Sequence, residues 1–289
     1  MNQIVSSVSL RASPPRAFTE ARAPLNFIRR QDSKPVFHSA ALTGGEMKIF
    51  FDTEAHTVGI SDMREITETL SVDQEGFELL HHTTAVEDLY DDDAIDRVYS
   101  PEIETLLRRR FGASQVVIFD VTRRSDDAAG AQNPDGVRAP AGRLHVDYTT
   151  TSGPQRAKDF LGEDEVARLT AAGARIIQIN VWRPIRGPVE RSPLALGDAS
   201  SVRQEDLIAT DQIFPDRVGE IYNLAHAPSQ RWYYAPRMTE DEVLLIKGWD
   251  SLDDGRARFT PHTAFNFPDT SEDALPRESI EVRTFVVID

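Results

Sequence analysis

Alternating apolar and polar residues dominate the C-terminal half of the chain and predict β-strands there. Ile177, Ile179 and Val181 alternate with Gln, Asn and Trp, so one face of this strand is apolar and the other carries functional groups. Helical patterns cover 101–111 and 154–172. Further strands are predicted at 114–121, 219–224, 230–234, 243–247 and 279–288.

The N-terminal half has less regular patterns. Two apolar runs separated by a polar turn predict a hairpin over 46–60, and the acidic stretch 62–94 is mostly helical in character. The helix at 101–111 has signals at both ends, with Ser100 as its N-cap and Gly112 as its stop. Helices before many short strands predict an α+β fold. Its core would be a double-stranded β-helix (a cupin-like jelly roll) with N-terminal and peripheral helices.

A single domain is predicted for the 289 residues. Residues 1–23 are expected to be flexible, and residues 143–288 are expected to form the jelly-roll core. The polar stretch 123–142 is longer than most loops in compact domains and ends just before His145. We therefore expect it to be a lid.

Composition limits the partners and the chemistry. The net charge of -15 argues against nucleic acid, which requires a cationic surface. The absence of cysteine excludes disulfides and thiolate metal sites, so any metal must be held by His and carboxylate ligands. No apolar run is long enough for a membrane helix, and no secretory signal is recognised, so a cytoplasmic protein is expected. The oligomeric state stays open, a homodimer included.

One short motif points to a metal site. In an extended segment, His145 and Asp147 would present an imidazole and a carboxylate on the same face, with Val146 turned into the core. His262 is favoured among the remaining histidines because it lies in an aromatic-rich strand that a jelly roll can bring alongside. Two His and one carboxylate form the facial triad of non-haem Fe(II) oxygenases, which leaves coordination positions open.

A second motif lies after His262, far enough along the chain for a turn and a return on an adjacent strand. Arg277, Ser279, Glu281 and Arg283 share one face of the closing strand. Arginines inside a barrel are costly unless each meets an anion, and a guanidinium binds a carboxylate through two parallel hydrogen bonds. Arg277 with Ser279, or instead Arg283, would therefore hold the distal carboxylate of 2-oxoglutarate.

Candidates for the substrate side come from the strand that begins near Arg175. Asn180, Trp182 and Arg183 are the residues considered for contact with the substrate, although Trp182 also suits a position in the core or at the rim.

The C-terminal half also resembles a known family, the hydroxylase/desaturases of secondary metabolism. This group includes the cephamycin 7α-methoxylation component and the fungal gibberellin desaturase. The resemblance covers about residues 143–288 and is looser over 24–122. It rests on four segments in particular, which are Asn180 to Pro184, Arg231 to Tyr234, Pro261 to Phe265 and Arg277 to Arg283.

The resemblance implies a double-stranded β-helix and a dioxygenase that uses Fe(II), 2-oxoglutarate and O2 on a small natural product. It implies that His145, Asp147 and His262 bind the metal, and it places the two arginines and the serine described above on the closing motif of the family. Two alternatives remain from the residues alone. One is an iron oxygenase that does not use 2-oxoglutarate, and the other is a cupin-like accessory protein with a structural metal.

Overall fold

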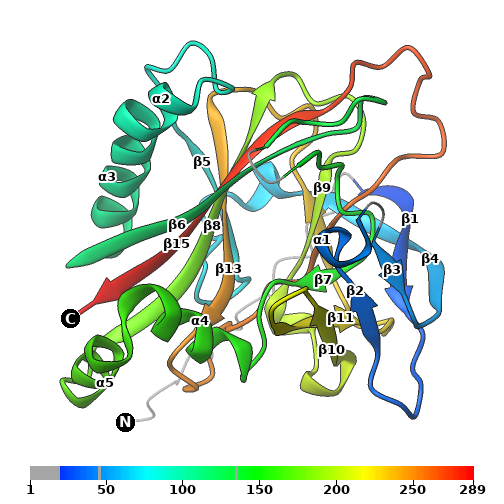
Figure 1. The fold of residues 1–289 in the computed structure, drawn as a ribbon. Helices are drawn as coiled ribbons and strands as arrows, with labels where there is room; N and C mark the ends of the chain where they lie inside the picture. Colours follow the sequence, from blue (N-terminus) through cyan, green and yellow to red (C-terminus); the bar gives the residue numbers. More distant parts are fainter. Residues whose placement is uncertain (1–19, 45–46, 134–135) are drawn as a thin grey trace, which may run out of the picture.

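The computed structural model describes residues 20–44, 47–133 and 136–289, and these residues form two β-sheets with a few short helices (Figure 1). The smaller sheet is antiparallel throughout. Its strands, in spatial order, are β5 (Phe77–His81), β13 (Glu242–Asp250), β8 (Arg175–Arg186), β15 (Glu278–Ile288) and β6 (Gln115–Ser125).

The larger sheet contains ten strands and is antiparallel except where β10 pairs with β2 and where β12 pairs with β4. Its strands, in spatial order, are β1 (Glu20–Ile28), β4 (Thr53–Asp62), β12 (Trp232–Tyr234), β9 (Leu194–Gly197), β14 (His262–Ala264), β7 (His145–Val146), β11 (Val218–Leu224), β10 (Leu207–Ile213), β2 (Val36–His38) and β3 (Lys48–Ile49).

The chain passes back and forth between the sheets. From β6 it crosses to β7, returns to β8, crosses to β9 and, after β12, returns once more to β13 before β14 and β15. This alternation is the winding of a jelly roll, as expected, and it places β7 and β14 of one sheet opposite β8 and β15 of the other.

The helices lie outside the sheets, and α3 runs along the outer face of the smaller sheet in Figure 1. None of the described helices has both the length and the apolar character that a membrane span requires. The α-helices are α1 (Ala40–Thr43), α2 (Asp92–Ala94), α3 (Ser100–Phe111), α4 (Ser152–Leu161) and α5 (Glu163–Ala171). The short helical turns are η1 (Met63–Ile66), η2 (Ile95–Tyr99), η3 (Ala199–Ser201) and η4 (Gln204–Asp206).

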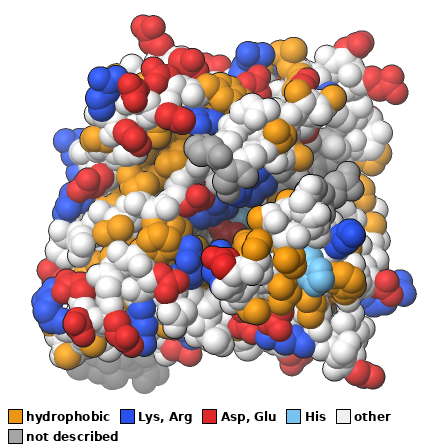
Figure 2. Space-filling model, in the orientation of Figure 1, with side chains coloured by type: hydrophobic (Ala, Val, Ile, Leu, Met, Phe, Trp, Pro, Cys, Tyr) orange, Lys and Arg blue, Asp and Glu red, His pale blue; other side chains and the backbone are white. Residues whose placement is uncertain are grey.

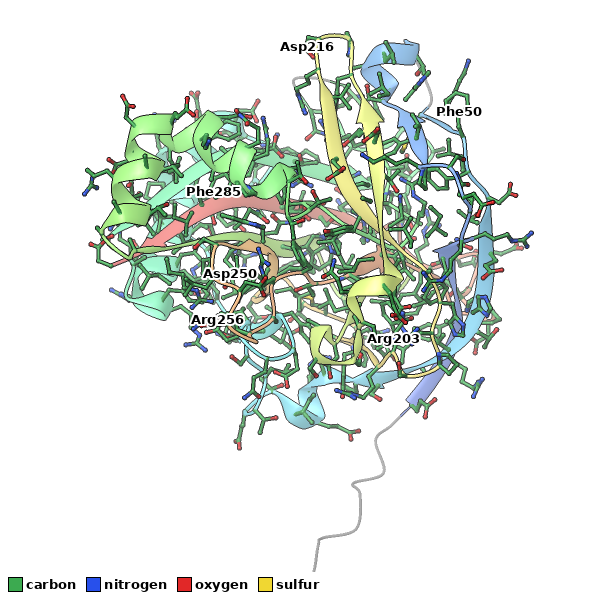
Figure 3. The ribbon with its side chains drawn as sticks, turned by 90° about the horizontal axis from the view of Figure 1, so that it is seen from below. Phe50, Arg203, Asp216, Asp250, Arg256 and Phe285 are labelled. Atoms are coloured by element: carbon green, nitrogen blue, oxygen red, sulfur yellow. The ribbon has the colours of Figure 1, made fainter. Side chains whose placement is uncertain are left out.

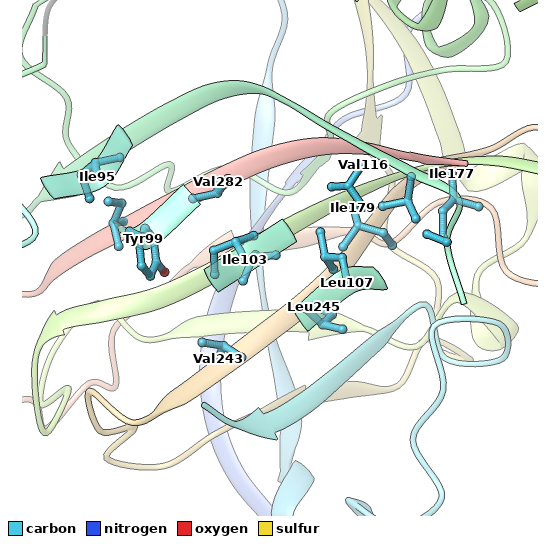
Figure 4. Close-up of a cluster of buried hydrophobic side chains, with 14 of the residues drawn as sticks. Ile95, Tyr99, Ile103, Leu107, Val116, Ile177, Ile179, Val243, Leu245 and Val282 are labelled. Atoms are coloured by element: carbon cyan, nitrogen blue, oxygen red, sulfur yellow. The ribbon is translucent and has the colours of Figure 1, made fainter. Parts of the chain in front are cut away.

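The apolar face of β8 packs under α3, as the alternation predicted. Ile103 and Leu107 of α3 are fully buried, and they belong to one cluster with the apolar side chains of β8, β13 and β15 (Figure 4). α3 ends at Gly112, whose φ of 63° lies in the left-handed region that glycine adopts without strain. The outer face of the smaller sheet is therefore structural, and polar side chains such as Asn180 of β8 point to the inner face.

A second cluster joins α4 to the inner face of β15. Phe285, labelled in Figure 3, stacks on Phe119 with ring centroids 5.0 Å apart, and Phe119 stacks on Phe160 of α4 at 4.6 Å. Phe285 and Val287 also share a buried cluster with Tyr148, just after β7. The inner face of β15 is thus apolar at its C-terminal end and polar at its N-terminal end.

Several N-terminal expectations were wrong. Residues 46–60 form no hairpin, because β3 pairs with β2, while β4 pairs with β1 and β12. The stretch 62–94 is not mostly helical, since it contains β5. The acidic Glu78 of β5 is buried, and Arg110 of α3 binds its carboxylate at 2.6 Å. Ser100 is not an N-cap, because α2, η2 and α3 form one continuous helical run.

Two expected segments have different boundaries from those predicted. Most of the segment 1–23 lies outside the described residues, and its last four residues belong to β1. The loop predicted at 123–142 begins later, because β6 continues to Ser125 in register with β15.

Candidate metal centre

The three predicted ligands meet where β7 and β14 face the smaller sheet. His145 and His262 are direct partners in the β7–β14 ladder, and Asp147 follows β7 by one residue. One ligand atom from each of the three lies within 4.8 Å of the others. The Nε2 atom of His145 is 3.5 Å from Oδ1 of Asp147. Val146 is fully buried, as predicted from the period of the strand.

Backbone carbonyls orient both imidazoles. Nδ1 of His145 lies 2.9 Å from the carbonyl oxygen of Arg143, and Nδ1 of His262 lies 3.0 Å from that of Thr260. A carbonyl only accepts hydrogen bonds, so each Nδ1 carries the proton. In the neutral imidazole this tautomer leaves the lone pair on Nε2, which is the form in which histidine binds a metal.

The carboxylate of Asp147 is held on one side. Its Oδ2 accepts a hydrogen bond of 2.7 Å from Nδ2 of Asn180 and lies 3.5 Å from Nε of Arg283. Its Oδ1 faces His145. Burial raises the pKa of Asp147, but the positive charge of Arg283 outweighs burial and holds that pKa well below its usual value. Asp147 is therefore ionised, as a metal ligand must be.

The electrostatics of His262 also suit a ligand. Burial lowers the pKa of His262, and repulsion from His145 lowers it further. The neutral imidazole is thus favoured. Two neutral imidazole nitrogens and one carboxylate oxygen are a donor set that fits Fe(II), with positions left for other ligands.

Arg283 is already surrounded by carboxylates. Its Nη1 is 2.5 Å from Oδ2 of Asp120, and its guanidinium also pairs with Glu281 and Asp147. Burial lowers the pKa of Arg283, but Glu281 and the two aspartates outweigh burial and raise it well above the usual value. Arg283 is accordingly paired with the carboxylates of three residues, one of which is the candidate ligand Asp147.

Arg277 is in the opposite situation. It is buried with 2% of its surface exposed, its Nη1 donates to the carbonyl of Ser192 at 2.7 Å, and its Nε has no partner among the described residues. The guanidinium lies 5.6 Å from the ring centre of Trp182. Burial and repulsion from Arg124 lower the pKa of Arg277 to about 9. A buried cation without a carboxylate partner is a site for an incoming anion.

The three candidates on β8 divide between its faces. Asn180 points to the centre, where it contacts Asp147, and Trp182 lies beside Arg277. Arg183 points the other way. Its Nη2 donates to the carbonyl of His82 at 2.7 Å, and its guanidinium lies 5.6 Å from the ring of Tyr99. The structure does not bring Arg183 to the centre, because adjacent residues of a strand face opposite sides.

The sequence reasoning missed the contribution of β6. Asp120, Thr122 and Arg124 share the face of β6 that meets the inner side of β15, since the first two contact Arg283. Arg124 is the direct partner of Ser279 in the β6–β15 ladder. Figure 2 shows a hollow near the middle of one face of the molecule, lined by Lys and Arg side chains. The signal that could have found these residues is the polar alternation after Phe119, which had been assigned to a loop from residue 123 onward.

Known proteins share this sequence and fold. The family described as "Oxidoreductase/YMDC permease-like domain" matches residues 25–287. The hydroxylase/desaturase efuI of Hormonema carpetanum is 33% identical over an alignment that covers 91% of this chain and 93% of the relative. The chain belongs to this hydroxylase/desaturase family. The hydroxylase/desaturase resemblance seen in the C-terminal motifs is thereby confirmed and extends through the N-terminal half.

Two further members of the family are informative. The alpha-ketoglutarate-dependent dioxygenase phiK from a fungal species is 32% identical and covers 80% of this chain and 83% of the relative. The solved structure of the iron and alpha-ketoglutarate-dependent endoperoxidase NvfI superposes with a TM-score of 0.80 and 27% identity, covering 93% of this chain and 98% of the other. The jelly-roll winding described above is thus the fold of a solved oxygenase.

Proposed function

We propose that this hydroxylase/desaturase is an Fe(II)- and 2-oxoglutarate-dependent dioxygenase in which His145, Asp147 and His262 bind the iron. The observation that carries the proposal is the meeting of these three side chains. Two strands and the residue after one of them bring the ligand atoms within 4.8 Å. Both imidazoles have Nε2 free, and the carboxylate is ionised. The names of the related proteins agree with this cofactor set.

Arg277 and Ser279 would hold the distal carboxylate of 2-oxoglutarate. Arg277 has an unpaired nitrogen and no carboxylate partner among the described residues, whereas Arg283 is paired with three carboxylates. Ser279 follows Arg277 on the same face and is buried. The contrast between the two arginines supports Arg277, because a guanidinium that already has several carboxylate partners offers little to a further anion.

Iron and 2-oxoglutarate, when bound, supply the oxidising chemistry that activates O2. The chain itself provides the shape of the site. Asn180 and Arg283 fix Asp147, the carbonyls of Arg143 and Thr260 fix the imidazoles, and Trp182 forms an apolar wall beside Arg277. Related proteins are named hydroxylase/desaturase or endoperoxidase, so the proposed substrate is a small natural product that is hydroxylated, desaturated or cyclised.

The triad is tested by turnover of 2-oxoglutarate to succinate with Fe(II) and O2. His262→Ala and Asp147→Ala should each lower succinate formation by more than about 100-fold, because losing a ligand costs more than losing one of its outer partners. His81→Ala is the matched control, since the side chain of His81 is 70% exposed on β5, and it should behave as wild type. Wild-type turnover in either triad variant would remove that residue from the ligand set.

A further inference from the structure

Arg124 lies beside the place proposed for 2-oxoglutarate. It faces Ser279 directly in the β6–β15 ladder, and the hydroxyl of Ser279 lies 3.5 Å from its backbone carbonyl. Arg277 precedes Ser279 by two residues and so shares its face. The charge on Arg124 acts on both Arg277 and Asp147. Arg124 therefore lies beside Ser279, at the proposed distal end of the cosubstrate site.

Two neighbouring guanidiniums in this region lack an anion. Among the described residues no carboxylate pairs with Arg124, whose Nη1 donates to the carbonyl of Ala139 at 2.8 Å. The guanidinium of Arg277 likewise donates to a carbonyl, that of Ser192, and pairs with no carboxylate among the described residues. The nearby Asp126 is engaged elsewhere, since Oδ1 accepts from the backbone N–H of Arg277 and Oδ2 accepts from Arg191.

The energetic consequence is strain between like charges. Burial and repulsion from Arg283 lower the pKa of Arg124, and burial and repulsion from Arg124 lower the pKa of Arg277. Glu281 acts in the opposite direction on both arginines, but the net shift of each pKa is downward. Two partly desolvated cations side by side are stable only with an anion between them. Arginine pairs of this kind suit a carboxylate, whose two oxygens accept several hydrogen bonds in one plane.

We propose that Arg124 is a second arginine for the distal carboxylate of the 2-oxoacid, acting with Arg277 and Ser279. This inference rests on the proposed function and deepens it. It assigns to β6 a part in selecting a dicarboxylic 2-oxoacid over a monocarboxylic one. A carboxylate bound by Arg277 alone would leave Arg124 without an anionic partner, whereas a carboxylate placed between the two guanidiniums accepts hydrogen bonds from both.

The test compares two cosubstrates of equal length. 2-Oxopentanoate has the same five carbons as 2-oxoglutarate and the same chelating end, but a methyl group replaces its distal carboxylate. Dissociation constants for both would be measured anaerobically on the Fe(II) enzyme, from visible absorption of the chelate. The proteins are wild type, Arg124→Gln, Arg124→Lys and Arg277→Gln. Arg109→Gln, an exposed position on α3, is the control.

Arg124→Gln should weaken the binding of 2-oxoglutarate by roughly 10- to 100-fold, which is the effect of losing one charge-assisted hydrogen bond. Its affinity for 2-oxopentanoate should change by less than about twofold, because no distal charge is present to lose. Arg277→Gln should show the same selectivity, and Arg124→Lys should lie between wild type and Arg124→Gln. The control should match wild type for both compounds.

Other outcomes overturn the proposal. Equal weakening of both compounds by Arg124→Gln would mean that Arg124 acts by tethering the loop at Ala139. Unchanged affinity for both would leave the distal carboxylate to Arg277 alone. Failure of the proposed function looks different, because wild-type protein would then give no chelate with either compound.

Discussion

Asp147 uses its two carboxylate oxygens differently, and this asymmetry is set by single residues. Asn180 and Arg283 occupy Oδ2, so Oδ1 is the oxygen that faces His145 and the metal position. A carboxylate held in this way would bind the iron through one oxygen and leave more positions open. The sequence suggested Asn180 as a substrate contact; from its hydrogen bond to Asp147 we propose that it positions this carboxylate.

Asn180→Ala should therefore weaken metal binding by about 10- to 100-fold, the usual cost of losing an outer partner of a ligand. The measurement is titration of apo-protein with Fe(II), or with Co(II) followed by its visible absorption. Thermal unfolding checks that the variant remains folded. Unaltered metal affinity in a folded variant would show that Arg283 alone is sufficient to hold Asp147.

The proximity of individual candidate residues could be predicted where one strand contains the information. His145 and Asp147 follow from alternation within a single extended segment, and Val146 is buried between them as expected. Arg183 was placed wrongly at the same site as Asn180, although three positions apart along a strand means opposite faces. Arg283 and Arg277 could not be told apart from sequence, because the difference lies in partners such as Asp120 that another strand supplies.

At the scale of elements, the two faces of β8 and β15 have different roles. The outer face packs against α3 through fully buried apolar side chains, and the inner face carries the polar centre. This separation predicts that the outer face can be weakened without altering the centre. The helix and the strands were predicted from local patterns. The pairing of β3 with β2 was not predicted, because a strand can pair with the next strand in the sequence or with one from elsewhere in the chain.

Leu107→Ala should lower the free energy of unfolding by about 2–5 kcal/mol, because it leaves a cavity among fully buried side chains. Arg109→Ala, on the exposed side of α3, should change it by less than about 0.5 kcal/mol. Urea unfolding followed by circular dichroism measures both. At low urea, metal affinity of Leu107→Ala should equal that of wild type. A loss of metal affinity there would mean that the two faces are coupled.

The whole molecule combines a net charge of -15 with a hollow near the middle of one face that is lined by Lys and Arg side chains (Figure 2). An anionic cosubstrate is therefore favoured at the centre and not at the general surface, where like charge repels it. The jelly roll and a His-Asp-His centre could be predicted from sequence. Arg124 could not, because only the register between β6 and β15 brings it to Ser279, and that register is set by contacts over more than 150 residues.

The central claim is an open iron site that binds 2-oxoglutarate directly. The most direct measurement is an anaerobic titration of apo-protein with Fe(II) and then 2-oxoglutarate, followed by visible absorption. A charge-transfer band that requires both additions is predicted for wild type and should be absent in His262→Ala. Iron binding without such a band would contradict the use of 2-oxoglutarate, and absence of iron binding would contradict the metal centre itself.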